Sequence, residues 1–255
     1  MPTRHGLHFH ESGEARAGTP LVLLHGAGGH SLGFLDLARR LGQVRHVVAL
    51  DLPGHGRSEA LADEAAAGLL EAYRDATGNL CAAMGFARAI LLGHSMGAAI
   101  VQLAAHAWPD RVAGMILVGA GARMPVHPAT PELLRKRPED FPALVARAGY
   151  SPETPRSIAE RWGAGLPACT PELAARDFEA CARFDSRPFA AAMSQPALVI
   201  GGADDVLISP RKTAELAALL PRCEHLTLPR AGHFPFHERE DEVAAAISAW
   251  LAGVP

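Results

Sequence analysis

The stretch Gly93-His94-Ser95-Met96-Gly97 follows the apolar run Ala89-Ile90-Leu91-Leu92 and precedes Ala98-Ala99-Ile100-Val101-Gln102-Leu103. An apolar run, a serine flanked by glycines at minus two and plus two, and a helix-forming segment are typical of a sharp strand-to-helix turn. Glycine at these two positions allows a close approach of neighbouring chain that a side chain would obstruct. The pattern predicts a serine hydroxyl at the apex of the turn and makes Ser95 a candidate nucleophile.

Composition and charge narrow the class of protein. The chain has 255 residues, 49% of them apolar, which is enough for one large α/β domain. Its 24 basic and 27 acidic residues give a net charge of −3, so neither nucleic acid nor an anionic membrane is an expected partner. A small neutral or weakly charged molecule fits better, while the oligomeric state stays open.

The sequence predicts a cytoplasmic protein without a metal or cofactor. Its start lacks the apolar stretch of a signal peptide, and no run approaches the roughly 18 apolar residues that span a bilayer. The four cysteines are widely spaced and form no C-x-x-C pair, which argues against a zinc site or a redox motif.

Short apolar runs alternate with helical patterns along most of the chain, as in a mostly parallel, doubly wound sheet with helices on both faces. The expected strands are Leu7 to His10, Leu21 to Leu24, Val47 to Leu50, Ala89 to Leu92, Met115 to Val118, Ala197 to Ile200 and Leu226 to Leu228. The expected helices are Leu32 to Leu41, Tyr73 to Met84, Met96 to Ala107, Arg211 to Leu220 and Glu240 to Leu251. The fold class is therefore α/β.

The alternation stops over residues 122–194, which are rich in proline, charge and helix-compatible residues. We interpret this stretch as a mostly helical insertion, with residues 1–121 and 195–255 forming the core. Its apolar side chains either face the core across a cleft or only hold the insertion together.

A serine nucleophile needs a base and an acid that orients the base. His233 lies in a glycine-containing loop after the last strand-like run, where a doubly wound sheet places residues beside its carboxyl edge. Asp204 and Asp205 follow the preceding strand, and the order serine, acid, histidine is met by either aspartate.

These motifs together resemble the α/β-hydrolase superfamily, in its members with a helical cap. The resemblance rests on His25-Gly26-Ala27-Gly28-Gly29, Asp51 to Ser58, the Ser95 turn, Gly201 to Asp205 and Gly232-His233, in the family's order and spacing. In such relatives the acid usually stands three residues after a glycine that closes the penultimate strand. Gly202 then selects Asp205, whereas Asp204 matches if Gly201 is the reference.

The resemblance also implies an oxyanion hole made of two backbone amides. One amide belongs to Met96, which follows the nucleophile and opens a helix. The other belongs to Ala27, with Gly28 as a weaker candidate.

Other residues near these motifs are expected to line a substrate pocket or to have structural roles. Gly26, Gly28, His94, Arg123 and Phe234 are the candidate pocket residues. Arg123 could meet a substrate carboxylate or form a surface salt bridge. His25 and His55 are expected to tie loops together by hydrogen bonds, and His237 to begin the final helix.

Ser95 argues against the haloalkane dehalogenases and epoxide hydrolases that resemble this fold, because those carry aspartate at the turn. The resemblance implies hydrolysis of carboxylic esters with small to medium acyl chains, with a small-molecule ester as substrate. Alternatives on the same triad are a carbon–carbon bond hydrolase of ring-cleavage products, a lactonase or a perhydrolase. A ligand-binding relative without catalysis is the alternative from a different class.

Overall fold

A computed structural model describes residues 3–13, 17–61 and 68–254. They form one eight-stranded sheet of order β1-β2-β4-β3-β5-β6-β7-β8. Strands β3 to β8 run parallel to one another, while β2 pairs antiparallel with both β1 and β4. The strands are β1 (Thr3–Arg4), β2 (Leu7–Ser12), β3 (Leu21–Leu24), β4 (Val47–Leu50), β5 (Ala89–His94), β6 (Val112–Val118), β7 (Ala197–Gly202) and β8 (Cys223–Leu228). The predicted doubly wound, mostly parallel sheet is confirmed.

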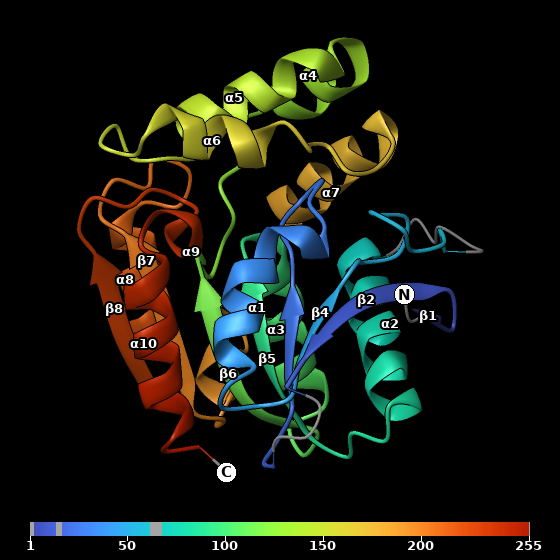
Figure 1. Ribbon diagram of the computed structural model, residues 1–255, viewed down its shortest axis with the longest axis vertical. Helices are drawn as coiled ribbons and strands as arrows, with labels where there is room; N and C mark the ends of the chain where they lie inside the picture. The colour runs from blue at the N-terminus through green and yellow to red at the C-terminus, as the bar shows by residue number, and fades with distance from the viewer. Residues whose placement is uncertain (1–2, 14–16, 62–67, 255) are drawn as a thin grey trace.

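Helices cover both faces of the sheet, as Figure 1 shows. The core helices are α1 (Leu35–Leu41), α2 (Leu69–Ala83), α3 (Met96–Ala107), α8 (Pro210–Leu219), α9 (Pro235–Glu238) and α10 (Glu240–Leu251), and a 3-10 turn, η1 (Ser31–Phe34), precedes α1. Alternate strand residues serve the two faces, because side chains alternate along a strand. Leu21 and Leu23 pack in the cluster of α1 and α10, whereas Val22 and Leu24 pack in the cluster of α2 and α3.

The segment between β6 and β7 contains no strand of the sheet and is mostly helical. Its helices are α4 (Thr130–Lys136), α5 (Phe141–Ala148), α6 (Arg156–Gly163) and α7 (Pro171–Arg183), with the 3-10 turns η2 (Pro138–Asp140) and η3 (Ala190–Ala192). Helices α4 to α6 lie as a layer beyond the carboxyl ends of the strands (Figure 1). We call α4 to α7 and their connections the helical insertion.

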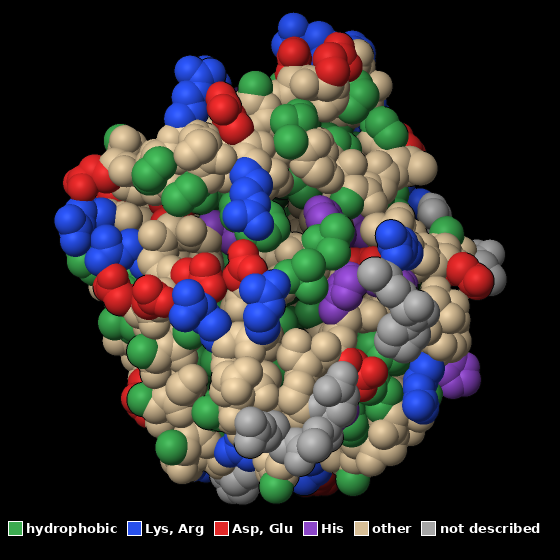
Figure 2. Space-filling model, in the orientation of Figure 1, with side chains coloured by type: hydrophobic (Ala, Val, Ile, Leu, Met, Phe, Trp, Pro, Cys, Tyr) green, Lys and Arg blue, Asp and Glu red, His purple; other side chains and the backbone are tan. Residues whose placement is uncertain are grey.

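The outer surface matches the nearly balanced charge of the sequence. Figure 2 shows both signs of charge interspersed on this face, with apolar and histidine side chains gathered below the helical insertion. Within the described ranges, no helix combines the length and the apolar character needed to cross a membrane.

Candidate active site

Ser95 lies at the turn between β5 and α3, as the sequence predicts. Its φ of 52° places a non-glycine residue in the left-handed region, a strained conformation that persists only where the surroundings impose it. A Cβ atom on Gly93 would lie 2.2 Å from the Gly97 carbonyl oxygen, and one on Gly97 would lie 2.1 Å from that of Leu24. Both glycines are therefore required by the close approach of backbone, and the serine is held at the carboxyl edge of the sheet.

His233 follows β8 and contacts Asp205, which follows β7. Its Nδ1 lies 2.8 Å from Asp205 Oδ2, and both side chains are buried. The other carboxylate oxygen of Asp205 accepts the backbone N–H groups of Leu207 and Ile208, each at 2.8 Å. A carboxylate at Nδ1 keeps the proton on that nitrogen and leaves Nε2 able to accept one.

Asp204 points elsewhere. Its Oδ2 accepts a hydrogen bond of 2.6 Å from the Ser151 hydroxyl, in the connection between α5 and α6. Of the two aspartates that the sequence leaves open, the structure thus places Asp205 against His233 and Asp204 against the helical insertion.

His94, at the end of β5, contacts the loop that carries His233. Its Nε2–H donates to the His233 carbonyl oxygen at 2.9 Å, and its ring packs 4.8 Å from the rings of both His233 and Phe234. Burial, with the neighbouring His233, lowers the pKa of His94 well below its ordinary value. His94 is therefore a neutral donor that holds the backbone of His233 in place.

The loop after β3 passes directly beside Ser95. A Cβ atom on Gly26 would lie 3.2 Å from the Ser95 Cβ, so a side chain there would crowd the serine. His25 stiffens this loop, because its Nδ1–H donates to Gly26 O at 2.9 Å while its Nε2 accepts the Leu52 amide at 3.0 Å. Burial lowers the pKa of His25 to about 3, which keeps the ring neutral. His25 thus ties two loops together, as expected.

The amides of Ala27 and Met96 are suited to an oxyanion hole. Neither has a hydrogen-bond acceptor within the part of the chain that the structure describes. The Gly28 amide, by contrast, donates to Asp177 Oδ2 at 2.9 Å. Of the two candidates in this loop, Ala27 is the one whose N–H is available to a ligand.

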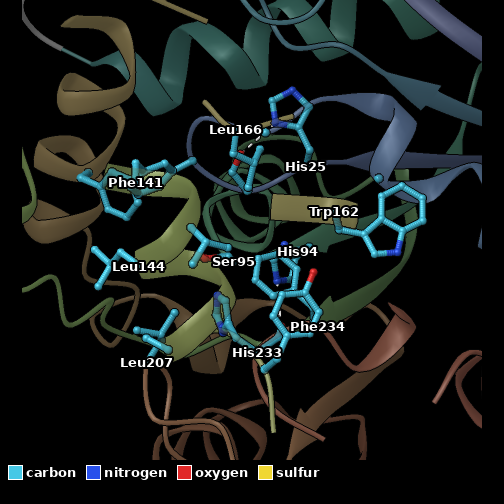
Figure 3. Close-up of a pocket in the computed structure, with 18 of the residues that line it drawn as sticks. His25, His94, Ser95, Phe141, Leu144, Trp162, Leu166, Leu207, His233 and Phe234 are labelled. Atoms are coloured by element: carbon cyan, nitrogen blue, oxygen red, sulfur yellow. Dashed lines mark hydrogen bonds between the residues drawn. The ribbon is translucent and has the colours of Figure 1, made fainter. Parts of the chain in front are cut away.

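A cavity of about 500 Å³ opens above Ser95 and His233, and both residues line it. Figure 3 shows their side chains beside each other, with Phe141, Leu144 and Leu166 of the helical insertion around them. Most other lining side chains are also apolar or aromatic: Phe34, Leu133, Val145, Tyr150, Trp162, Phe178, Leu207, Phe234 and Phe236. Apolar side chains of the helical insertion thus face the core across a cleft, one of the two alternatives left open by the sequence.

The candidate pocket residues divide into two groups. Gly26, His94 and Phe234 line the cavity, whereas Gly28 and Arg123 do not. Arg123 lies next to Asp185 instead, with Nε 4.0 Å from Asp185 Oδ2, and its side chain is mostly exposed. The Gly28 amide donates to Asp177 instead, and Arg123 lies beside Asp185. Arg123 takes the salt bridge that the sequence offered as its alternative.

Sequence reasoning did not anticipate the contacts that His237 makes with aromatic residues at the wall of the cavity. His237 lies in α9, before the final helix, which corrects its expected place. Its Nε2–H donates to Gly33 O at 2.9 Å, and its Nδ1 accepts the Tyr150 hydroxyl at 3.0 Å. Its ring stacks on Trp162 of α6 with centroids 4.3 Å apart. Tyr150 and Trp162 belong to the helical insertion, and no local pattern in the sequence pairs them with His237.

The residues at the cavity carry groups suited to acid–base and nucleophilic chemistry. Within residues 3–13, 17–61 and 68–254, no cluster of three or more His, Cys, Asp or Glu side chains is arranged to hold a metal ion. Ser95, His233 and Ala27 line this apolar space, Asp205 contacts His233 from behind it, and Met96 directly follows Ser95. This arrangement can activate a hydroxyl and stabilise an anion that develops next to it.

Known proteins share this organisation. Residues 21–246 match the family model described as "Alpha/beta hydrolase family". The chain is 32% identical, over 92% of its own length and 64% of that protein, to the dihydrolipoyllysine-residue acetyltransferase component of an acetoin cleaving system from Pseudomonas putida. It is 29% identical to the pimeloyl-[acyl-carrier protein] methyl ester esterase of a Shewanella species, over 96% of this chain and 94% of that one. A thermophilic esterase from Thermogutta terrifontis superposes with a TM-score of 0.86 at 26% identity, covering 97% of this chain and 93% of that one.

Proposed function

Because the chain belongs to the alpha/beta hydrolase family, we propose that it is a serine hydrolase that cleaves carboxylic esters with small to medium acyl chains. The single observation that carries the proposal is the meeting of Ser95 and the His233–Asp205 pair in one apolar cavity. Esterases are among its relatives by sequence and by structure. The cavity volume of about 500 Å³ suits an acyl group of modest size.

In the proposed reaction His233 Nε2 takes the proton of the Ser95 hydroxyl as its oxygen attacks the ester carbonyl carbon. The amides of Ala27 and Met96 donate to the carbonyl oxygen as it becomes an oxyanion, and the helix that begins at Met96 adds a favourable dipole. Collapse of this intermediate breaks the bond to the alcohol oxygen, which receives the proton from His233. Water then attacks the acyl-enzyme, with His233 again acting as the base.

Asp205 has two tasks in this scheme. Its Oδ2 holds the proton on His233 Nδ1, and its charge stabilises the imidazolium that forms when His233 accepts the Ser95 proton. The two backbone amides on Oδ1 fix the carboxylate, so its charge does not move away from the ring.

The test is a panel of aryl esters of increasing acyl length, hydrolysed by the wild type and by Ser95→Ala. We expect Ser95→Ala to lower kcat by several powers of ten, because the attacking oxygen is gone. A fluorophosphonate probe should label the wild type covalently at Ser95. Equal ester hydrolysis by the two proteins would contradict the proposal, and an unlabelled wild type without esterase activity would favour a ligand-binding protein.

A further inference from the structure

A buried cluster joins the helical insertion to the loop beside Ser95. Asp177, in α7, is fully buried and accepts hydrogen bonds from groups of the core. Its Oδ1 accepts the Tyr73 hydroxyl, and its Oδ2 accepts His55 Nε2–H and the Gly28 amide, all at 2.9 Å. The esterase scheme uses none of these side chains directly.

His55 enters this cluster as a cation. Its Nδ1 lies 3.0 Å from the Pro53 carbonyl oxygen and its Nε2 lies 2.9 Å from the Asp177 carboxylate, so both nitrogens act as donors. Burial opposes the charge on His55, but the Asp177 carboxylate outweighs it and raises the pKa of His55 to about 10. Asp177 is thus the counter-ion of a fully buried histidine, and its carboxylate is fixed in place.

Gly28 is held by the helical insertion at both of its backbone polar groups. Its N–H donates to Asp177, and its carbonyl accepts the Ala168 amide at 2.8 Å. Its φ of +64° turns the chain sharply at this point. The Gly28 N–H lies in the peptide plane that begins at the Ala27 Cα, so the bond to Asp177 holds Ala27 at its carbonyl side, next to the plane that carries the Ala27 N–H.

We propose that Asp177 is a positioning residue that holds the oxyanion loop, residues 25–29, with the Ala27 amide directed into the cavity. This inference rests on the proposed function, because it concerns the geometry of the same oxyanion hole. The helical insertion then does more than cover the substrate: its docking through Asp177 completes the catalytic site.

The expected effect is a loss of transition-state stabilisation rather than of substrate binding. Removal of a whole oxyanion donor lowers kcat by about 10²–10³-fold in other hydrolases, so a misdirected donor should cost less, about 10–100-fold. KM should change by less than about threefold, since the donor acts on charge that develops after binding.

The experiment compares three full-length variants with the wild type. Asp177→Ala removes the acceptor of the Gly28 amide, and Asp177→Asn keeps an oxygen that can accept it. Tyr73→Phe is the matched control, because it removes a buried hydrogen bond to the same carboxylate at Oδ1 and leaves the contact with Gly28 at Oδ2. The readouts are kcat and KM for an aryl ester, the affinity of a trifluoromethyl ketone that adds to Ser95, and the melting temperature.

We expect Asp177→Ala to lower kcat and the trifluoromethyl ketone affinity by the same factor, because the tetrahedral adduct carries the oxyanion and uses the same donors. Asp177→Asn should lose about threefold to tenfold in both quantities, and Tyr73→Phe less than about threefold, although all three variants lower the melting temperature. A purely structural role predicts a lower melting temperature with unchanged kcat in the folded protein.

A folded Asp177→Ala variant with wild-type kcat and inhibitor affinity would overturn the inference, as would equal losses in Asp177→Ala and Tyr73→Phe. If Asp177→Ala does not fold, Asp177→Asn is compared with Tyr73→Phe instead. Equal kcat values and equal trifluoromethyl ketone affinities in these two variants would then overturn the inference. Fluorophosphonate labelling separates this result from the proposed function. A wild type that is not labelled contradicts the esterase, whereas labelling at equal rates in the wild type and Asp177→Ala contradicts only the role of Asp177.

Discussion

At the scale of single residues, two adjacent aspartates have different partners. The Asp205 carboxylate accepts His233 Nδ1–H and two backbone amides, while the Asp204 carboxylate accepts the hydroxyl of Ser151. We expect Asp205→Asn to lower kcat for an aryl ester by about 10³–10⁴-fold, because the amide no longer holds the required tautomer of the histidine. Asp204→Asn should retain kcat within about threefold, since it loses one hydrogen bond remote from the reacting atoms. Steady-state kinetics of both variants decides, and the reverse ranking would contradict the assignment.

The same residues show which parts of the candidate site can be predicted from the sequence. Ser95 and His233 can be named from it, because each stands in a glycine-marked turn at the carboxyl end of a strand-like run. The choice between Asp204 and Asp205 depends on which side chain points at His233, so the sequence favours Asp205 only through the resemblance to a family. No sequence pattern marks Asp177 as part of the site, because it lies in an ordinary charged helix. Its partner Gly28 is 149 residues away along the chain.

At the scale of elements, clear apolar patterns predicted the bounds of several core helices and strands correctly, whereas weak patterns at the edges of the sheet did not. Helices α3 and α10 have the predicted bounds, and β3 and β4 do as well. Strand β8 begins at Cys223 rather than Leu226, because it is the last strand of the sheet and several of its first residues are exposed. Strand β1 has two exposed residues and no apolar run to mark it. Edge strands need few buried side chains, so hydrophobic periodicity predicts them poorly.

A side chain of helix α6, Trp162, lies between two cavities. Trp162 lines both the large cavity and a second one of about 300 Å³ that reaches Asp36 and Arg161. We expect Trp162→Ala to join the two spaces and to raise kcat/KM for bulky or long-chain esters, relative to acetyl esters, by about tenfold or more. Trp162→Phe retains an aromatic wall and serves as the control. The measurement is the ratio of kcat/KM values over the acyl series, and an unchanged ratio in Trp162→Ala would contradict a role of α6 in limiting substrate size.

At the scale of the whole molecule, the helical insertion is fastened to the core at both loops that carry the proposed chemistry. Asp177 holds Gly28 in the loop after β3, and the Gly149 carbonyl accepts the His233 amide at 2.7 Å. Glu238 adds a further link, because its carboxylate accepts the amides of both Ser151 and Gly232. The sequence predicts a helical insertion over a pocket, but these contacts join segments far apart along the chain and arise only from the packed fold.

The packing around three histidines also makes the free energy of unfolding depend on pH. Burial lowers the pKa values of His25 and His237 to about 3, so both rings are neutral in the fold. In the unfolded chain they bind protons near their ordinary value of 6.5, and the free energy of unfolding therefore falls as the pH drops below that value. His55 acts in the opposite direction: its raised pKa gives stability that is lost as the pH rises from 6.5 through about 10.

His237 allows this linkage to be measured, because its ring stacks against those of Tyr150, Phe234 and Trp162. Between pH 6.5 and 5 it should contribute up to about 1.4 kcal/mol per pH unit to the loss of stability. His237→Gln keeps polar atoms at this position but does not titrate, so its stability should fall less steeply by that amount even where the variant is less stable overall. Urea unfolding at several pH values gives both slopes. Parallel slopes in the wild type and His237→Gln would show that the ring does not stay neutral in the fold.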